Sequence, residues 1–185
     1  GIGVLGKTGA GVLELQGLGP NDVPILVGTL GKAFGTFGAF VAGSEVLIEF
    51  LIQKARTYIY TTAMPAAIAE ATRTSLRLVQ EESWRREHLA GLISRFRAGA
   101  QSLGLALGES DSPIQPVLVG DSRSAVSAQT RLLDAGFLVV AIRPPTVPKG
   151  TARLRCTLTA RHAVEDVDRL LDALSGCPEL RQFKA

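Results

Sequence analysis

The stretch Pro24-Ile25-Leu26-Val27-Gly28-Thr29-Leu30-Gly31-Lys32-Ala33-Phe34-Gly35 places a lysine directly after a short apolar run and between glycines. The apolar residues 24–30 predict a buried strand, and the glycines predict a sharp turn that a flat ligand can approach closely. A partly desolvated lysine in such a turn can form a Schiff base with an aldehyde cofactor. Thr29 could present its hydroxyl to a phosphate of that cofactor. A tight turn with a solvated lysine is the alternative, and the spacing alone does not separate the two.

Strand and helix patterns alternate outward from this stretch, which indicates an α/β or α+β fold. Ser44 is expected to cap one helix, and Pro65 is expected at the first position of another. Further strands are expected over residues 37–42, 116–119, 137–142 and 153–159, and helices over 46–55, 66–80, 83–103, 124–134 and 162–174. Two helices show one buried face each by their apolar spacing: Leu89, Leu92, Ile93 and Phe96 in one, and Val164, Val167, Leu170, Leu171 and Leu174 in the other.

The composition is that of a globular protein and argues against several classes of function. The chain has 185 residues, of which 46% are hydrophobic and 20% charged. A net charge of +3, with basic residues scattered beside acidic ones, disfavours nucleic-acid binding. The longest apolar runs are too short to cross a bilayer, and the N-terminus has no signal-peptide pattern, so a cytoplasmic protein is expected. Two cysteines and two histidines without ligand spacing predict reduced thiols and no metal site.

A second motif, Gly1-Ile2-Gly3-Val4-Leu5-Gly6-Lys7-Thr8, fits the G-x-x-x-x-G-K-[ST] pattern of a phosphate-binding loop. Such a loop needs a strand before it and a helix that begins at the loop, because the helix N-terminus holds the phosphates. Gly9-Ala10-Gly11 follows the motif, and glycine is a poor helix former. These features argue against a phosphate-binding loop. A P-loop nucleotide-binding module is kept as the alternative from a different class.

Several stretches together resemble the α-oxoamine synthases, fold-type I pyridoxal-phosphate enzymes that condense an amino acid with an acyl-CoA and release CO2. The similarity runs over nearly the whole chain apart from its last residues. It implies an α/β fold made of part of a large-domain sheet followed by a small α+β C-terminal domain. The matching stretches are Gly1-Ile2-Gly3-Val4-Leu5-Gly6, Thr29-Leu30-Gly31-Lys32, Tyr60-Thr61-Thr62-Ala63-Met64-Pro65, Ile142-Arg143-Pro144-Pro145-Thr146-Val147-Pro148 and Gly150-Thr151-Ala152-Arg153-Leu154-Arg155.

The resemblance implies that pyridoxal 5'-phosphate is the cofactor and that Lys32 binds it covalently. Lys32 would also remove the α-proton of the amino-acid substrate as a general base. Thr29 would contact the cofactor phosphate. Thr62, next to Thr61, matches a position that reaches the phosphate across a dimer interface, so a homodimer is implied as well.

The substrates that the resemblance implies are L-alanine and a pimeloyl thioester of CoA or of acyl carrier protein. Thr146 corresponds to a substrate-binding threonine, Arg155 to the arginine that binds the amino-acid carboxylate, and Arg143 would lie near the substrate. A planar guanidinium can bind both carboxylate oxygens at once. Another α-oxoamine synthase, such as glycine C-acetyltransferase, is the alternative within the family. A surface ion pair is the competing interpretation of the arginines.

The same resemblance predicts the domain limits of the chain, and the chain differs from the family pattern in two places. Residues 1–75 are expected to belong to the cofactor-binding large domain, 76–104 to a connecting helix and 105–185 to the small domain. Ala66 stands where the family has a second proline. The family's Asp-x-Ala-His run, which precedes the Gly1–Gly6 match, is absent, so we expect an incomplete C-terminal portion with little or no synthase activity alone. A folded remnant without any ligand is the third possibility.

Overall fold

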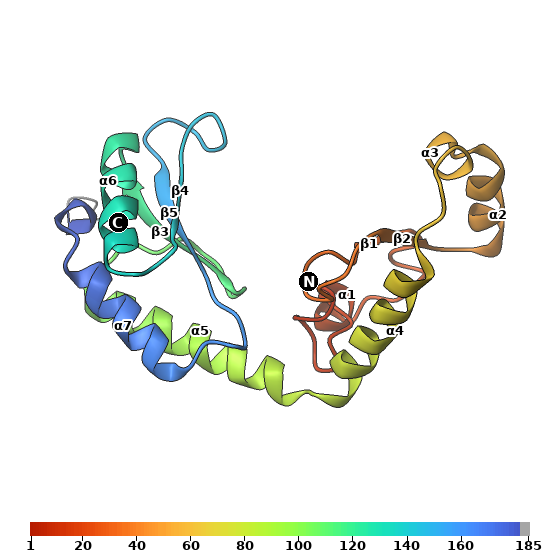
Figure 1. Ribbon diagram of the computed structural model, residues 1–185, viewed down its shortest axis with the longest axis horizontal. Coiled ribbons are helices and arrows are strands. Elements are labelled where there is room, and N and C mark those ends of the chain that lie inside the picture. The colour runs from red at the N-terminus through yellow and green to blue at the C-terminus, as the bar shows by residue number, and fades with distance from the viewer. Residues whose placement is uncertain (182–185) are drawn as a thin grey trace. The chain divides into compact units, whose positions relative to one another are not determined.

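The computed structural model describes residues 1–181, and the chain forms two compact units, residues 1–86 and the residues from Glu87 onward. Figure 1 labels their helices and strands. Both units contain helices and strands, as the sequence predicts. In the first unit two consecutive strands are followed by three consecutive helices, so the predicted alternation is found only in the second unit, where two of the strands are also consecutive. None of the described helices is long and apolar enough to cross a membrane.

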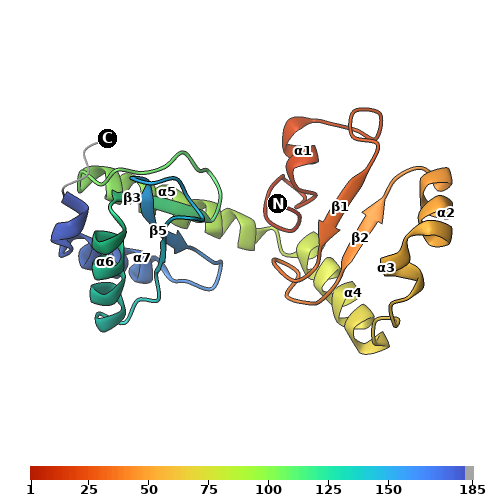
Figure 2. The same ribbon diagram turned by 90° about the horizontal axis from the view of Figure 1, so that it is seen from above.

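The first unit is built around a two-stranded antiparallel sheet (Figure 2). Strands β1 (Leu26–Thr29) and β2 (Ala39–Ala42) pair with Leu26 opposite Ala42 and Thr29 opposite Ala39. The loop between them contains Lys32. The helices of the unit are α1 (Val12–Gln16), α2 (Glu45–Lys54), α3 (Arg56–Ile59) and α4 (Ala66–Glu81).

The two helix starts predicted in this unit are close to those observed. The Ser44 hydroxyl accepts a hydrogen bond from the Leu47 amide and caps α2, as expected. Pro65 is the N-cap of α4 and not its first helical residue, because its ψ of 137° is extended. The prediction was therefore wrong by one position.

The first strand exists as predicted, but it is not buried within the chain. Gly28 is buried in β1, whereas Val27 is 65% exposed. Successive side chains of a strand point to opposite faces of the sheet. Gly28 lies on the face occupied by Ile2 and the Phe40 ring. Val27 and Thr29 lie on the other face, and both are exposed.

The second unit packs three helices on one face of a three-stranded antiparallel sheet in the order β3-β5-β4. Buried and more exposed residues alternate along β3 and β5, so one face is covered and the other open. The central strand is β5 (Ala152–Thr157), flanked by β3 (Ile114–Gly120) and β4 (Val140–Ile142). The helices are α5 (Trp84–Ser102), α6 (Ser122–Asp134) and α7 (Val164–Ser175), followed by the 3-10 turn η1 (Pro178–Arg181).

The core of the second unit matches the periodicity of the sequence with one exception. Leu89, Leu92, Ile93 and Phe96 are buried on α5, and Val167, Leu170, Leu171 and Leu174 on α7, as predicted. Val164 is 38% exposed, so its predicted burial was wrong. It is the first residue of α7 and precedes the helical turns that pack on the sheet.

Strand β4 is shorter than predicted because its expected first residues do not pair. Gly136 has a φ of 87°, and the Val139 amide donates back to the Phe137 carbonyl over 3.1 Å. Leu138 is 86% exposed. Residues 137–139 therefore form a turn, and pairing with β5 begins at Val140.

Both cysteines are buried and free, in agreement with the reduced thiols expected from the sequence. Burial raises the pKa of the Cys156 thiol to about 12. Because the thiolate is the reactive form, this cysteine is inert at neutral pH. No cluster of potential metal ligands occurs among residues 1–181.

Candidate functional site

The loop that carries Lys32 has a fixed backbone. Its base is closed by two hydrogen bonds: the Leu30 amide donates to the Gly38 carbonyl over 2.8 Å, and the Thr36 amide donates to the Leu30 carbonyl over 3.0 Å. Inside the loop the Gly35 amide donates to the Lys32 carbonyl over 2.9 Å. Gly35 adopts a φ of 63°, which favours glycine over residues with a side chain. The glycine-bounded turn predicted from the sequence is therefore present.

Lys32 itself is exposed, so the partial desolvation expected from the sequence is not found in this chain. The neighbouring Phe34 is only 8% exposed and anchors the loop in the first unit. On the other side of the loop lies Gly3, where an added Cβ would be 2.9 Å from the Ala33 Cβ. The lysine thus projects from a loop whose neighbouring residues are held on two sides.

Two threonine hydroxyls that the resemblance assigns to the cofactor phosphate also lie in the first unit. Thr29 ends β1, three residues before Lys32, and is exposed. Thr62 is exposed in the irregular segment between α3 and α4. This segment lies beside the base of the Lys32 loop. The Met64 sulfur would be 3.5 Å from a Cβ added at Gly38, whose carbonyl closes the loop. Both hydroxyls are therefore accessible to a ligand.

The glycine-rich motif at residues 1–8 does not have the geometry of a phosphate-binding loop. The Glu14 carboxylate accepts hydrogen bonds from the Thr8 amide (2.8 Å), the Ala10 amide (3.0 Å) and the Thr8 hydroxyl (3.1 Å). In a phosphate-binding loop the amides of the motif would bind phosphate oxygens and the threonine hydroxyl would bind Mg²⁺, whereas here the amide and the hydroxyl of Thr8 both bond Glu14. Helix α1 begins only at Val12 and has five residues. The protein's own carboxylate therefore occupies this loop.

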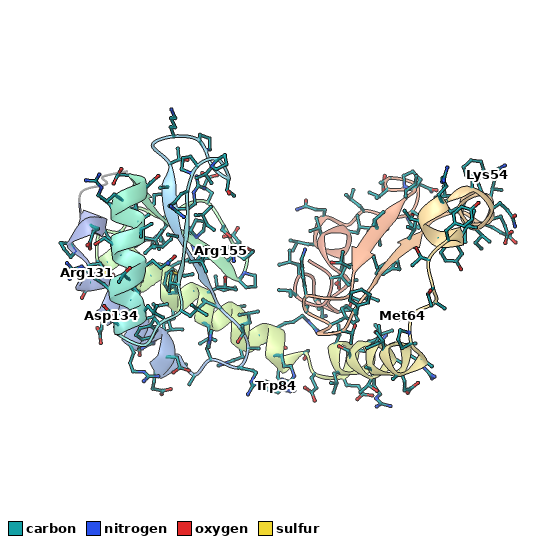
Figure 3. All side chains as sticks on the ribbon, turned by 45° about the horizontal axis from the view of Figure 1, so that its top comes forward. Lys54, Met64, Trp84, Arg131, Asp134 and Arg155 are labelled. Atoms are coloured by element: carbon teal, nitrogen blue, oxygen red, sulfur yellow. The ribbon has the colours of Figure 1, made fainter. Side chains whose placement is uncertain are left out.

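Arg155 lies on the open face of the sheet in the second unit. It is exposed on β5, opposite Pro116 of β3 and Val140 of β4. Figure 3 labels it on the side of the sheet away from Arg131 and Asp134 of α6. Arg155 forms no ion pair or side-chain hydrogen bond with any residue of 1–181, so the surface ion pair that was the competing interpretation is not found there.

The two other predicted substrate residues lie in the loop between β4 and β5 of the same unit. Arg143 and Thr146 are both exposed. The Thr146 amide donates to the Arg143 carbonyl over 3.0 Å, which places the two residues at opposite ends of one turn. Each unit therefore contains one group of the predicted residues: Lys32, Thr29 and Thr62 in the first, and Arg143, Thr146 and Arg155 in the second.

Three polar residues that form hydrogen bonds to the Lys32 loop or to the glycine-rich loop were not predicted from the sequence. Thr72 and Ser75 of α4 bond the Lys32 loop, and Glu14 bonds the glycine-rich loop. A hydroxyl in the middle of a helix and a glutamate near a glycine-rich segment are both common on protein surfaces. The spacing of three between Thr72 and Ser75 places them on one helix face, but it does not reveal which segment that face meets.

Comparison with known proteins gives a consistent result. Residues 2–174 match the model of the aminotransferase class I and II family. The 8-amino-7-oxononanoate synthase of Thioalkalivibrio sulfidiphilus is 66% identical over 94% of this chain and 44% of its own length. That of Methylococcus capsulatus is 63% identical over 95% of this chain and 45% of its own length. The chain thus spans less than half of the length of these two relatives.

Solved structures show the same similarity. The crystal structure of 8-amino-7-oxononanoate synthase from Francisella tularensis superimposes with a TM-score of 0.88 at 31% identity, over 98% of this chain and 53% of that one. A structure of SPT with a PLP internal aldimine gives a TM-score of 0.89 at 32% identity, over 95% of this chain and 44% of that one. The architecture described above is therefore shared with two solved proteins whose chains are longer than this one.

Proposed function

This chain belongs to the aminotransferase class I and II family, and on that premise we propose that it is the C-terminal portion of an 8-amino-7-oxononanoate synthase. The whole enzyme would condense L-alanine with pimeloyl-CoA or pimeloyl-acyl carrier protein, with loss of CO2, in biotin biosynthesis. The observation that carries the proposal is the Lys32 loop. An exposed amine projects from a hydrogen-bonded loop directly after β1, three residues after an exposed threonine hydroxyl.

The described residues fit pyridoxal 5'-phosphate chemically. A lysine amine can bind its aldehyde carbon, and threonine hydroxyls can donate to its phosphate. Lys32 would bind the aldehyde, and Thr29 and Thr62 would bind the phosphate. When bound, the cofactor supplies an electron sink that stabilises negative charge at the substrate's α-carbon. The SPT structure with its PLP internal aldimine supports this assignment.

Two roles in the reaction would fall to side chains of this chain. The amine of Lys32 would take the proton from the α-carbon of alanine and later return it. The Arg155 guanidinium would bind the alanine carboxylate through two hydrogen bonds, which fixes the orientation of the α-carbon. The absence of an ion-pair partner for Arg155 among residues 1–181 supports a ligand-binding role. Thr146 and Arg143 would contact the substrate from the β4–β5 loop.

The assembly and the domain limits are part of the same proposal. We propose a cytoplasmic homodimer in which Thr62 of one copy reaches the cofactor phosphate of the other. Tyr58 and Tyr60, near Thr62, are 66% and 77% exposed, and exposed aromatic side chains are typical of surfaces that become buried in an assembly. Residues 1–75 would form the remainder of the large domain, 76–104 the connecting helix and 105–185 the small domain.

Steady-state kinetics on the full natural chain that contains these residues tests the function. We expect condensation of L-alanine with pimeloyl-CoA or its carrier-protein thioester, and little turnover of glycine with acetyl-CoA. Lys32→Ala should abolish turnover, and Arg155→Lys should mainly raise the KM for alanine, because lysine cannot bind both carboxylate oxygens in the same plane. Lys54→Ala is the matched control and should leave turnover unchanged. Preferential use of glycine and acetyl-CoA would contradict the substrate assignment.

A further inference from the structure

Helix α4 donates a hydrogen bond to the loop that carries Lys32. The Ser75 hydroxyl donates to the Phe34 carbonyl over 2.7 Å, across a separation of 41 residues. Phe34 follows Lys32 by two residues and is buried. A serine in a helix usually points to solvent or bonds the carbonyl four residues before it in the same helix. Here the hydroxyl instead fixes the backbone on the C-terminal side of the lysine.

A second hydroxyl on the same face of α4 acts on the other side of the lysine. Thr72 Oγ1 lies 2.9 Å from Thr36 Oγ1, and Thr36 Oγ1 donates to the Leu30 carbonyl over 3.2 Å. Leu30 precedes Lys32 by two residues. Thr72 Oγ1 also lies 2.8 Å from the Ile68 carbonyl. When its one proton goes to Thr36, the Thr36 proton remains available for Leu30.

These contacts bear on where the Lys32 amine can go. The lysine side chain is long, flexible and exposed, so packing against neighbouring side chains does not restrict the position of its amine. The backbone on both sides of Lys32 is tied to a 16-residue helix through partly buried hydroxyls. A functional group is held in productive geometry by the residues that support it. Fixing the base of this side chain therefore raises the fraction of time that the amine spends within reach of one position.

We propose that Ser75 and Thr72 are positioning residues for Lys32, which hold its loop so that the amine is presented to the cofactor aldehyde. This inference rests on the proposed cofactor role of Lys32 and adds to it two residues that touch neither cofactor nor substrate. Removal of either hydroxyl should release one side of the loop while leaving the fold intact.

The test compares variants of the full natural chain that differ only in these hydroxyls. Ser75→Ala and Thr72→Val remove the hydrogen bonds, and Thr72→Ser keeps the hydroxyl. Thr74→Val is the matched control, because Thr74 is an exposed threonine on the same helix with no side-chain hydrogen bond to residues 1–181. Each apoprotein receives subsaturating pyridoxal phosphate and then borohydride. Peptide mapping gives the ratio of label at Lys32 to label at exposed Lys54, an internal standard on α2.

We expect the Lys32-to-Lys54 ratio to fall about 2- to 10-fold in Ser75→Ala and Thr72→Val, the range that loss of one hydrogen bond produces in an equilibrium. Thr72→Ser and Thr74→Val should keep the wild-type ratio. Amide hydrogen exchange without cofactor should become faster at Thr36 and Gly35, whose amides close the loop. If Ser75→Ala does not fold, the Thr72→Val and Thr72→Ser pair decides.

An unchanged ratio in both hydroxyl-removing variants overturns the positioning role, even if loop exchange becomes faster, because a purely structural contact would give that result. In that case Lys32 is still labelled and the proposed function stands. A wild-type protein without label at Lys32 overturns the proposed function and this inference with it. The two failures are therefore distinguishable.

Discussion

The residue Glu14 gives the glycine-rich loop a different use from the one its motif predicts. Its carboxylate accepts hydrogen bonds from the Thr8 amide, the Thr8 hydroxyl and the Ala10 amide. The backbone hydrogen bond from Thr8, together with the weaker ones, holds the pKa of Glu14 below its ordinary value of 4.5. A hydrogen bond to the charged form of a carboxyl group favours that form.

The lowered pKa of Glu14 gives a pH dependence with a definite sign. The folded state favours ionised Glu14 more than the unfolded state does, so its contribution to stability is fully present above about pH 5 and is lost as the pH falls through the lowered pKa. In Glu14→Gln this contribution should be absent. We expect the thermal unfolding midpoint of the variant to fall less steeply than that of the wild type between about pH 5 and pH 3.

The control for this comparison is Glu49→Gln, which removes the same charge at an exposed position in the middle of α2, away from the helix N-terminus. It should preserve the acid slope of the wild type. Parallel slopes for the wild type and Glu14→Gln would show that the Glu14 hydrogen bonds do not persist in solution.

Single residues differ in how well the sequence could predict their roles. Lys32 stood out because glycines and an apolar strand flank it locally, and the structure confirms the turn. Its exposure was not predictable, because burial depends on segments distant in sequence. Ser75 and Thr72 were missed for the same reason: their partners are 41 and 36 residues away. Local patterns contain no information on which helix face will meet which loop.

At the scale of elements, helix α5 contains two glycines in different surroundings. A Cβ added at Gly91 would meet nothing within 4 Å. A Cβ added at Gly99 would collide with the Leu171 side chain of α7. Leu171 is only 9% exposed and belongs to the core of the second unit. Gly99 therefore lets α7 approach α5 closely, whereas Gly91 has no such role.

Replacement by alanine is therefore predicted to affect stability differently at the two glycines. Gly91→Ala should raise the free energy of unfolding by about 1 kcal/mol, because alanine is the better helix former. Gly99→Ala has the same helical gain, but it must displace Leu171 at a cost of roughly 1–3 kcal/mol for overpacking. We expect Gly99→Ala to be the less stable variant in urea-induced unfolding followed by circular dichroism. Equal stabilisation by both changes would contradict the packing of α7 on α5.

Elements with a strong apolar period were predicted best. The buried face of α5 is as expected, because four apolar residues at helical spacing fix it independently of context. Strand β4 was predicted too long because its apolar run 137–142 fits a strand throughout. The left-handed Gly136 and the turn at Phe137 remove the first three residues from the sheet. An apolar run shows that a strand is possible, and pairing partners decide where it begins.

At the scale of the whole molecule, the two units differ in how their apolar residues are used. The second unit has a continuous core that includes Phe96, Leu154 and Leu174, each at 0% exposure. In the first unit, helices α1 to α4 contain no buried residue. Large apolar side chains such as Phe50 and Val46 are 61% and 80% exposed there. Surfaces of this kind are typical of regions that pack against further protein.

The central claim is that Lys32 binds pyridoxal phosphate, and direct mapping of the bond tests it. The protein is incubated with pyridoxal phosphate and reduced with borohydride, and its peptides are analysed by mass spectrometry. We predict one phosphopyridoxyl group per chain at Lys32 and none in stoichiometric amount at Lys7 or Lys54. Lys32 without label, both in this chain and in the full natural chain that contains it, would contradict the claim.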